Sequence, residues 1–150
     1  MAQAPAFSLP NQKEQTVSLS DFTGKYLIFY FYPRDNTPGC TIEAKEFSAL
    51  KEEFASLNCS IVGVSKDTIK KHQNFIAKQE LTIDLLSDEE NSVIDAYGAW
   101  QLKKNYGKEY MGIVRSTFLI SPTGEIVKEW TKVRVKGHVD EVFATLKELV

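Results

Sequence analysis

Residues 26–33 of the chain read YLIFYFYP, an apolar and aromatic run that a proline ends. The run lacks the apolar–polar alternation of a strand that has one face in water. It is typical of a strand covered on both faces, as at the centre of a parallel sheet. Proline ends such a strand because it has no amide hydrogen for the sheet ladder. The run therefore predicts a central strand of an α/β domain.

Strand and helix patterns alternate on both sides of this strand. Beyond it, apolar residues recur at spacings of three and four from Ala44 to Leu57, which predicts one helix that opens at Gly39 and Cys40. We expect further strands at residues 16–19, 60–65, 82–86, 117–120 and 125–130, a cap at residues 20–21, and helices at residues 67–79, 92–97 and 139–150. Residues 117–130 read as a hairpin around a Ser-Pro-Thr-Gly turn. The order predicts one domain over residues 1–150, with a central mixed sheet flanked by helices in a thioredoxin-like fold.

The amino-acid composition and charge argue against several classes of protein. The chain has 150 residues, of which 43% are hydrophobic and 11% aromatic, which argues against intrinsic disorder. Its formal net charge is -2, whereas a nucleic-acid-binding protein usually has a basic excess. The same balance gives no support for electrostatic attachment to a membrane. We expect neither nucleic acid nor membrane as a partner.

The first residues contain neither a basic segment nor the apolar segment of a signal peptide, and the run at 26–32 is too short to span a bilayer. We therefore expect a soluble protein of the reducing cytoplasm, in which both cysteines are free thiols at rest. Two histidines and two distant cysteines do not have metal-site spacing, so we expect no metal and no cofactor.

Cys40 lies where the reactive groups of an α/β domain are expected. It follows a loop, residues 33–37, between the buried strand and the start of a helix. Ligands of α/β sheets collect beyond the carboxyl ends of the strands, and the amides of a first helical turn favour negative charge. The position therefore favours the thiolate, the nucleophilic form of cysteine, over an inert buried thiol.

The residues around Cys40 resemble a known active site. Pro33, Thr37 and Cys40 have the spacing of the peroxiredoxin motif, in which proline, threonine and cysteine are separated by three and two residues. The longer string from Phe31 to Ala44 is similar to the peroxiredoxin Q subfamily, also called bacterioferritin comigratory protein. The resemblance continues at residues 63–65, 85–88, 97–98 and 115–120, and so covers nearly the whole chain.

The resemblance implies a thiol peroxidase that acts in antioxidant defence and redox homeostasis, without a cofactor. Cys40 would be the peroxidatic nucleophile that becomes a sulfenic acid, and Pro33 would shield its pocket. Thr37 would hydrogen-bond the thiolate or the peroxide, and Arg115 would stabilise the thiolate and the developing oxygen charge. The backbone N–H groups of Gly39 and Cys40 are further donors for the transferring oxygen.

Other residues near the motif have two interpretations. Glu43 either orients Arg115 or only adds a favourable charge to the first helical turn. Arg34 reads as a solvated loop cation. The lysines around Tyr106 and Gly107 read as a solvated loop, although the chain near Trp100 could border the pocket. His72 is interpreted as a half-buried histidine with satisfied hydrogen bonds, and His138 as a surface residue.

The sequence departs from the subfamily in its resolving cysteine. Many members have a second cysteine five residues after the first, where this chain has Lys45. Cys59 should enter the next parallel strand at the opposite end of the sheet, too far for a disulfide, which needs Cα atoms within about 7 Å. We therefore expect a one-cysteine cycle, in which thioredoxin or another thiol reduces Cys40. The resemblance implies a monomer. Cys59 as an intermolecular resolving thiol is the alternative.

Two other classes of function are open to the same scaffold. A disulfide oxidoreductase would need a Cys-x-x-Cys pair, which the chain lacks. A redox sensor would pass the Cys40 sulfenic acid to a partner protein, and a holdase chaperone would expose a sizeable apolar patch.

Overall fold

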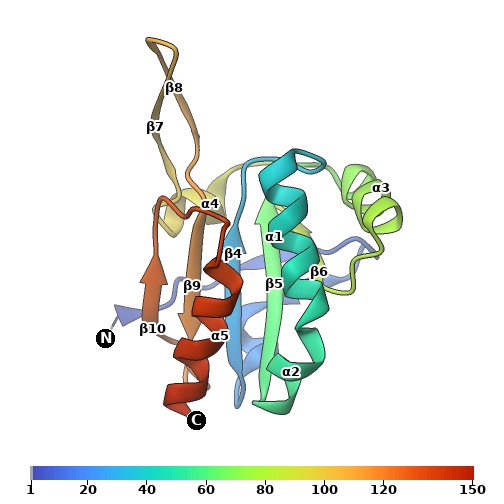
Figure 1. Ribbon diagram of the computed structural model, residues 1–150, viewed down its shortest axis with the longest axis vertical. Helices are drawn as coiled ribbons and strands as arrows, with labels where there is room; N and C mark the ends of the chain where they lie inside the picture. Colours follow the sequence, from blue (N-terminus) through green and yellow to red (C-terminus); the bar gives the residue numbers. More distant parts are fainter. Residues whose placement is uncertain (1) are drawn as a thin grey trace.

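The computed structural model describes residues 2–150 and has a six-stranded sheet at its centre (Figure 1). The strands lie in the order β1 (Ala2–Gln3), β10 (Glu125–Trp130), β9 (Ser116–Ile120), β4 (Tyr26–Phe31), β5 (Cys59–Ser65) and β6 (Asp84–Ser87). β4, β5 and β6 are parallel, and β9, β10 and β1 add antiparallel pairs on the other side of β4. The predicted mixed sheet with β4 at its centre is confirmed.

Helices and a small hairpin cover the two faces of the sheet. One core cluster packs on α1 (Pro38–Ala49), α2 (Lys51–Ser56), α3 (Ile69–Gln79) and α5 (His138–Leu149). The other packs on α4 (Ser92–Ala96) and on the N-terminal segment, which holds β2 (Ser8–Pro10), β3 (Thr16–Ser18) and the short 3-10 helix η1 (Leu19–Phe22). In the described residues, no helix is both long and apolar enough to cross a membrane.

β4 is buried on both faces, as its sequence predicts. Ile28, Tyr30 and Tyr32 belong to the first core cluster, and Leu27, Phe29 and Phe31 belong to the second. Each of these side chains is at most 1% exposed. Side chains alternate across a strand, so a strand between two core layers must be apolar at every position.

The structure differs from the sequence-based expectations in several elements. The single helix expected up to Leu57 is divided at Leu50, where α1 ends and α2 begins. The cap expected at residues 20–21 lies earlier, because the backbone N–H of Ser18 bonds the Asp21 carboxylate at 2.8 Å. The short strands β1 and β2 were not expected. The remaining expected helices and strands are confirmed with shifts of one or two residues at their ends.

The segment expected to be a solvated loop is instead the hairpin of β7 (Trp100–Asn105) and β8 (Lys108–Ile113). Tyr106 and Gly107 form its two-residue turn, with φ of 52° and 78°. Two successive positive φ values are typical of the turn that matches the twist of a hairpin. The hairpin projects beyond the end of the main sheet (Figure 1), which explains why its residues are largely exposed.

Gly63 gives a test of the packing against β5. A Cβ atom there would lie 2.8 Å from Cζ of Tyr30 and 2.9 Å from Cδ2 of Leu85. We predict that Gly63→Ala lowers the free energy of unfolding by about 1–3 kcal/mol, because two packed side chains must move. Urea denaturation measures it, and adding Tyr30→Phe should restore part of the loss. A Gly63→Ala protein as stable as the wild type would contradict this description of the core.

Candidate active site

The loop between β4 and α1 brings Cys40 to the carboxyl end of the central strand. β4 ends at Phe31, and Thr37 caps α1 with extended backbone angles. Asn36 has φ 63°, a left-handed conformation that asparagine tolerates better than most residues, and it reverses the chain. Cys40 is therefore the third residue of α1, in the first turn, and its side chain is 1% exposed.

The neighbouring antiparallel strand brings Arg115 to the same place. Ser116 is the first residue of β9 and pairs with Phe31, the last residue of β4, so Arg115 lies just beyond the end of β4. Its Nη2 donates a hydrogen bond to Sγ of Cys40 at 3.3 Å. Its Nη1 donates to Oε1 of Glu43 at 2.7 Å. One guanidinium thus joins two side chains that are one turn apart on α1.

The pKa values of Glu43 and Arg115 are both shifted in this partly buried pair. The side chain of Glu43 is fully buried and that of Arg115 is 15% exposed. Burial raises the pKa of Glu43 to about 7, although Arg115 acts in the opposite direction. Burial also lowers the pKa of Arg115, but the charges of Glu43 and Cys40 outweigh it, and the result is a raised pKa. Arg115 therefore stays charged beside Cys40. The bond from its Nη1 to Glu43 is the contact that the first of the two interpretations of Glu43 requires.

Gly39 gives the guanidinium its space. A Cβ atom at Gly39 would lie 3.1 Å from Nη2 of Arg115, closer than most carbon contacts in proteins. The absence of a side chain therefore lets the guanidinium approach Cys40 over the first turn of α1.

Pro33 and Thr37, in the segment before Cys40, face the β7–β8 hairpin. They line a cavity of about 340 Å³ whose other walls include Trp100, Tyr110 and Lys66. The hydroxyl of Thr37 donates its one hydrogen to the carbonyl of Arg34 at 2.8 Å. Its oxygen is therefore oriented to accept a hydrogen bond from a molecule in the cavity, rather than to donate one to the thiolate. The contribution of the hairpin to this cavity was anticipated only for Trp100, because the sequence of β7 and β8 has no apolar period.

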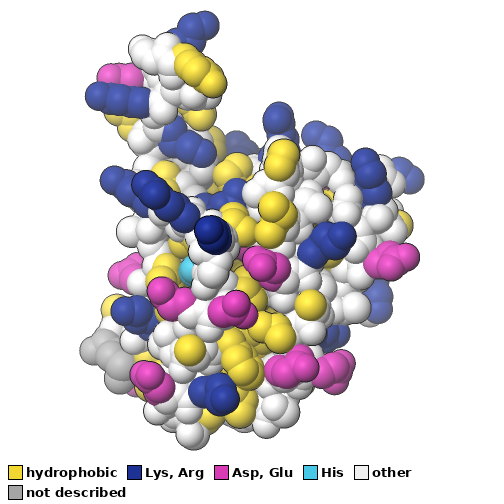
Figure 2. All heavy atoms as spheres, in the orientation of Figure 1, with side chains coloured by type: hydrophobic (Ala, Val, Ile, Leu, Met, Phe, Trp, Pro, Cys, Tyr) yellow, Lys and Arg dark blue, Asp and Glu magenta, His cyan; other side chains and the backbone are white. Residues whose placement is uncertain are grey.

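Basic side chains gather at this end of the molecule. On the face seen in Figure 2, most Lys and Arg side chains lie in the upper half, near the hairpin and the start of α1, and most acidic ones lie lower. The loop before α5 adds exposed Lys132, Arg134 and Lys136. Arg34 is exposed too, as expected of a loop cation. Such a distribution raises the local positive potential, which favours the approach of anionic partners.

Cys59 lies at the other end of the sheet. It is the first residue of β5 and pairs with Tyr26, the first residue of β4, whereas Cys40 follows the last residue of β4. Five residue steps along the strand separate the two ends, which is about 17 Å. Cys59 is 5% exposed, and burial raises the pKa of its thiol to about 12. In the resting structure it is neither near Cys40 nor prone to ionise.

The two histidines are more buried than expected. His72 is fully buried rather than half-buried, and its ring nitrogens lie 2.7 Å from Oδ2 of Asp35 and 3.0 Å from the Leu86 carbonyl, so its hydrogen bonds are satisfied as expected. The expectation of a surface position for His138 is wrong. Its side chain is buried beneath Trp130 with Nε2 2.8 Å from Oγ1 of Thr117, and burial lowers its pKa to about 4.

The raised pKa of the buried Glu43 carboxyl can be tested through the pH dependence of stability. Its raised pKa means that the folded protein keeps a proton between about pH 4.5 and 7 that the unfolded chain loses, so the wild type loses stability as pH rises through this window. Glu43→Gln lacks this loss. We predict that the stability of Glu43→Gln relative to wild type increases from pH 4.5 to 7 by roughly 3 kcal/mol, then stays level, because one pH unit is worth about 1.4 kcal/mol.

Urea denaturation at several pH values measures this difference. The lowered pKa of His138 acts in the opposite direction between about pH 4 and 6.5, but it is common to both proteins and cancels in the difference. Glu52→Gln, at an exposed glutamate of α2, is the matched control and should show no such trend. A pH-independent difference for Glu43→Gln would show that this carboxyl ionises normally.

Comparisons with known proteins agree with this geometry. Residues 1–129 match the model of the AhpC/TSA family. Peroxiredoxin Bcp of Bacillus subtilis is 51% identical over 147 residues, which are 98% of this chain and 94% of that protein. A structure of Xanthomonas campestris peroxiredoxin Q superposes with a TM-score of 0.92 at 43% identity, covering 96% of this chain and 92% of that one.

A second structure, PrxQ of Xylella fastidiosa, has a TM-score of 0.92 at 39% identity and covers 99% of this chain and 96% of that one. The thioredoxin-like fold and the resemblance inferred from the Pro33, Thr37 and Cys40 motif are thereby confirmed. The chain belongs to the peroxiredoxins of the AhpC/TSA family and is a thiol peroxidase.

Proposed function

We propose that Cys40 is the peroxidatic nucleophile and that this chain completes its cycle with an external thiol. The thiolate sulfur attacks the terminal oxygen of a peroxide, an S–O bond forms, and the O–O bond breaks. The sulfur becomes a sulfenic acid, and the departing oxygen takes up a proton as water or an alcohol. The observation that supports this most is the hydrogen bond from Arg115 to the Cys40 sulfur.

Arg115 is proposed to act on both the ground state and the transition state. Its hydrogen bond to Sγ favours the thiolate, and its fixed charge faces the oxygen on which negative charge develops. A thiol with an ordinary pKa near 8.5 is about 3% ionised at pH 7, so full ionisation raises its rate only about thirty-fold. A fast peroxidase therefore needs donors aimed at the peroxide as well.

Three further groups are proposed to hold the peroxide. The Thr37 oxygen would accept the hydrogen of the attacked peroxide, because its own hydrogen is directed to Arg34. The backbone N–H groups of Gly39 and Cys40, in the first turn of α1, would donate to the same oxygens. Pro33 would exclude water from one side of the sulfur. All these groups come from one chain, which fits a monomeric enzyme.

The cavity beside Thr37 supports organic hydroperoxides as substrates in addition to hydrogen peroxide. Trp100, Tyr110 and Ile113 provide apolar wall in the cavity that Thr37 also lines. A related protein, the bacterioferritin comigratory protein of Xanthomonas campestris, has alkyl peroxide reduction activity, and its structure is known with a trapped intermediate or ligand. In this chain, an alkyl substituent on the peroxide would lie in the cavity during attack.

An external thiol is proposed to reduce the sulfenic acid. The thiol would attack the Cys40 sulfur and release water, and a second thiol would break the mixed disulfide. Lys45, an exposed residue, stands where many relatives of this subfamily have a resolving cysteine, and Cys59 is buried at the far end of the sheet. Ile42, which is 52% exposed and two residues from Cys40, offers an apolar contact for a protein reductant such as thioredoxin. Such a cycle suits the reducing cytoplasm.

Replacing Arg115 tests the proposed role directly. We predict that Arg115→Lys lowers the second-order rate constant for hydrogen peroxide about 10²–10³-fold, because lysine keeps the charge but loses the planar fork whose two nitrogens bond Glu43 and Cys40 separately. Loss of peroxide in stopped-flow competition measures it, with Cys40→Ser as the inactive baseline. Arg134→Lys, at an exposed arginine, should react like the wild type. A wild-type rate constant in Arg115→Lys would remove Arg115 from the mechanism.

Cys59 is tested by turnover. We predict that Cys59→Ser reduces peroxide with dithiothreitol or thioredoxin at a rate within about two-fold of wild type, because its buried thiol is remote from Cys40. Steady-state peroxide consumption measures this. Complete loss of turnover in a folded Cys59→Ser protein, together with disulfide-linked dimers in the wild type, would assign Cys59 as an intermolecular resolving thiol.

A further inference from the structure

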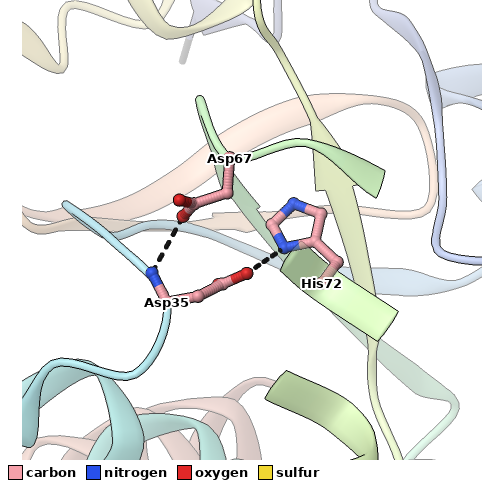
Figure 3. A group of neighbouring side chains, drawn as sticks. All are labelled: Asp35, Asp67 and His72. Carbon is pink, nitrogen blue, oxygen red and sulfur yellow. Dashed lines mark hydrogen bonds and ion pairs between the residues drawn. The ribbon is translucent and has the colours of Figure 1, made fainter. Parts of the chain in front are cut away.

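Asp35, in the middle of the loop that precedes Cys40, is held at three of its atoms. Its backbone N–H donates to Oδ2 of Asp67 at 2.8 Å. Its Oδ1 accepts from the Tyr32 hydroxyl at 2.6 Å. Its Oδ2 lies 2.7 Å from Nδ1 of His72, and Figure 3 shows how Asp35 lies between His72 and Asp67. All four residues are buried. The loop that precedes Cys40 is thus held by a buried polar cluster. We call this cluster, which consists of Asp35, Asp67 and His72, the Asp35 anchor.

The hydrogen bonds of the Asp35 anchor are complementary. Nε2 of His72 lies 3.0 Å from the Leu86 carbonyl, which can only accept, so Nε2 carries a hydrogen. The contact between Nδ1 and Oδ2 of Asp35 is then completed by one shared hydrogen. Oδ2 of Asp67 accepts from Oγ of Ser65 as well as from the Asp35 amide. Each facing atom therefore has a partner, as buried polar groups require.

The same three side chains have the composition of a metal site, and their ligand atoms lie within 4.8 Å of one another. A cation would have to displace hydrogen bonds that already satisfy these atoms, including those of the Asp35 amide, Ser65 and Tyr32. The geometry therefore favours a hydrogen-bonded anchor over a metal centre.

The Asp35 anchor joins elements that are distant in sequence. Asp67 follows the end of β5, His72 lies on α3, and the Leu86 carbonyl belongs to β6. Asp67 and His72 bond Asp35 directly, and the Leu86 carbonyl holds the ring of His72. Asp35 lies one residue before the left-handed Asn36 and two before Thr37, so the anchor fixes the chain just ahead of the first turn of α1.

We propose that Asp35, Asp67 and His72 are positioning residues for peroxide reduction: they fix the loop that places Thr37 and Cys40 relative to Arg115. The proposal rests on the peroxidase chemistry of Cys40 proposed above. Reactions that depend on several donors around one atom are sensitive to small displacements, and a shift of about 1 Å costs up to about a hundred-fold in rate. Loss of the anchor should therefore slow peroxide reduction in a protein that is still folded.

Two rates at the same sulfur separate positioning from general stability. Oxidation of Cys40 by hydrogen peroxide needs the donors around the oxygen, whereas alkylation by iodoacetamide needs only an accessible thiolate. We expect Asp35→Ala and His72→Leu to lower the peroxide rate constant about 10–100-fold and to leave alkylation unchanged or faster. Thermal unfolding establishes that each variant is folded at the assay temperature, and Asp95→Ala, at an exposed aspartate, is the matched control.

Asp35→Asn is the conservative variant that distinguishes geometry from charge. Its amide oxygen can accept from Tyr32 while its NH₂ donates to Nδ1 of His72, so every hydrogen bond of the side chain is kept. We expect a peroxide rate constant within about three-fold of wild type. Tyr32→Phe, which removes one bond but keeps the aromatic ring, should give an intermediate loss and serves if Asp35→Ala does not fold.

An unchanged ratio of the peroxide to the alkylation rate constant in folded Asp35→Ala or Tyr32→Phe would overturn the proposal. So would an Asp35→Asn protein as slow as Asp35→Ala, because the bond pattern would then not be the determinant. Failure of the underlying peroxidase chemistry is recognised separately, since wild type itself would then react with peroxide no faster than Cys40→Ser.

Discussion

The site depends on one guanidinium that bonds both the sulfur of Cys40 and the carboxyl group of Glu43. Arg115 bonds the Cys40 sulfur with one nitrogen and the Glu43 carboxylate with the other. Both partners lie on α1, so the arginine can reach them only from a neighbouring strand that ends at the same level. The pairing of Ser116 with Phe31 provides that alignment, and the absence of a side chain at Gly39 provides the space. A register shift of one residue would turn Arg115 to the other face of the sheet.

Burial strengthens the interaction between Arg115 and Glu43, and it also disfavours the charged form of Glu43. A carboxyl as buried as Glu43 resists ionisation, and an unpaired buried charge is strongly destabilising. The arginine and the glutamate therefore stabilise each other's charged forms, and the arginine is left with a fixed direction toward the sulfur. The sheet beneath is rigid because β4 is covered on both faces, and the Asp35 anchor extends that rigidity into the loop. The loop that precedes Cys40 is therefore held as firmly as a segment of the core.

Local patterns in the sequence predicted the parts of the structure that have a local cause. The apolar run at 26–32 predicted β4, and the spacing of Pro33, Thr37 and Cys40 carried the resemblance to the peroxiredoxins. The break at Leu50 was missed because α1 and α2 present their apolar residues to the same core, so the period continues across it. The β7–β8 hairpin was missed because its strands are exposed, and neither face has the apolar alternation of a half-buried strand. Burial of His138 and the Asp35 anchor depend on partners between 21 and 37 residues away, which no local pattern indicates.

The central claim is that peroxide oxidises Cys40 to a sulfenic acid that no other thiol of the chain intercepts. The most direct test is the intact mass of the wild type after one equivalent of hydrogen peroxide, with a sulfenic-acid trap present. The account predicts a single trap adduct, located at Cys40 by peptide mapping. Loss of two hydrogens, with Cys40 and Cys59 joined in one disulfide within the chain, would contradict it, because α1 would then have to unfold in every cycle.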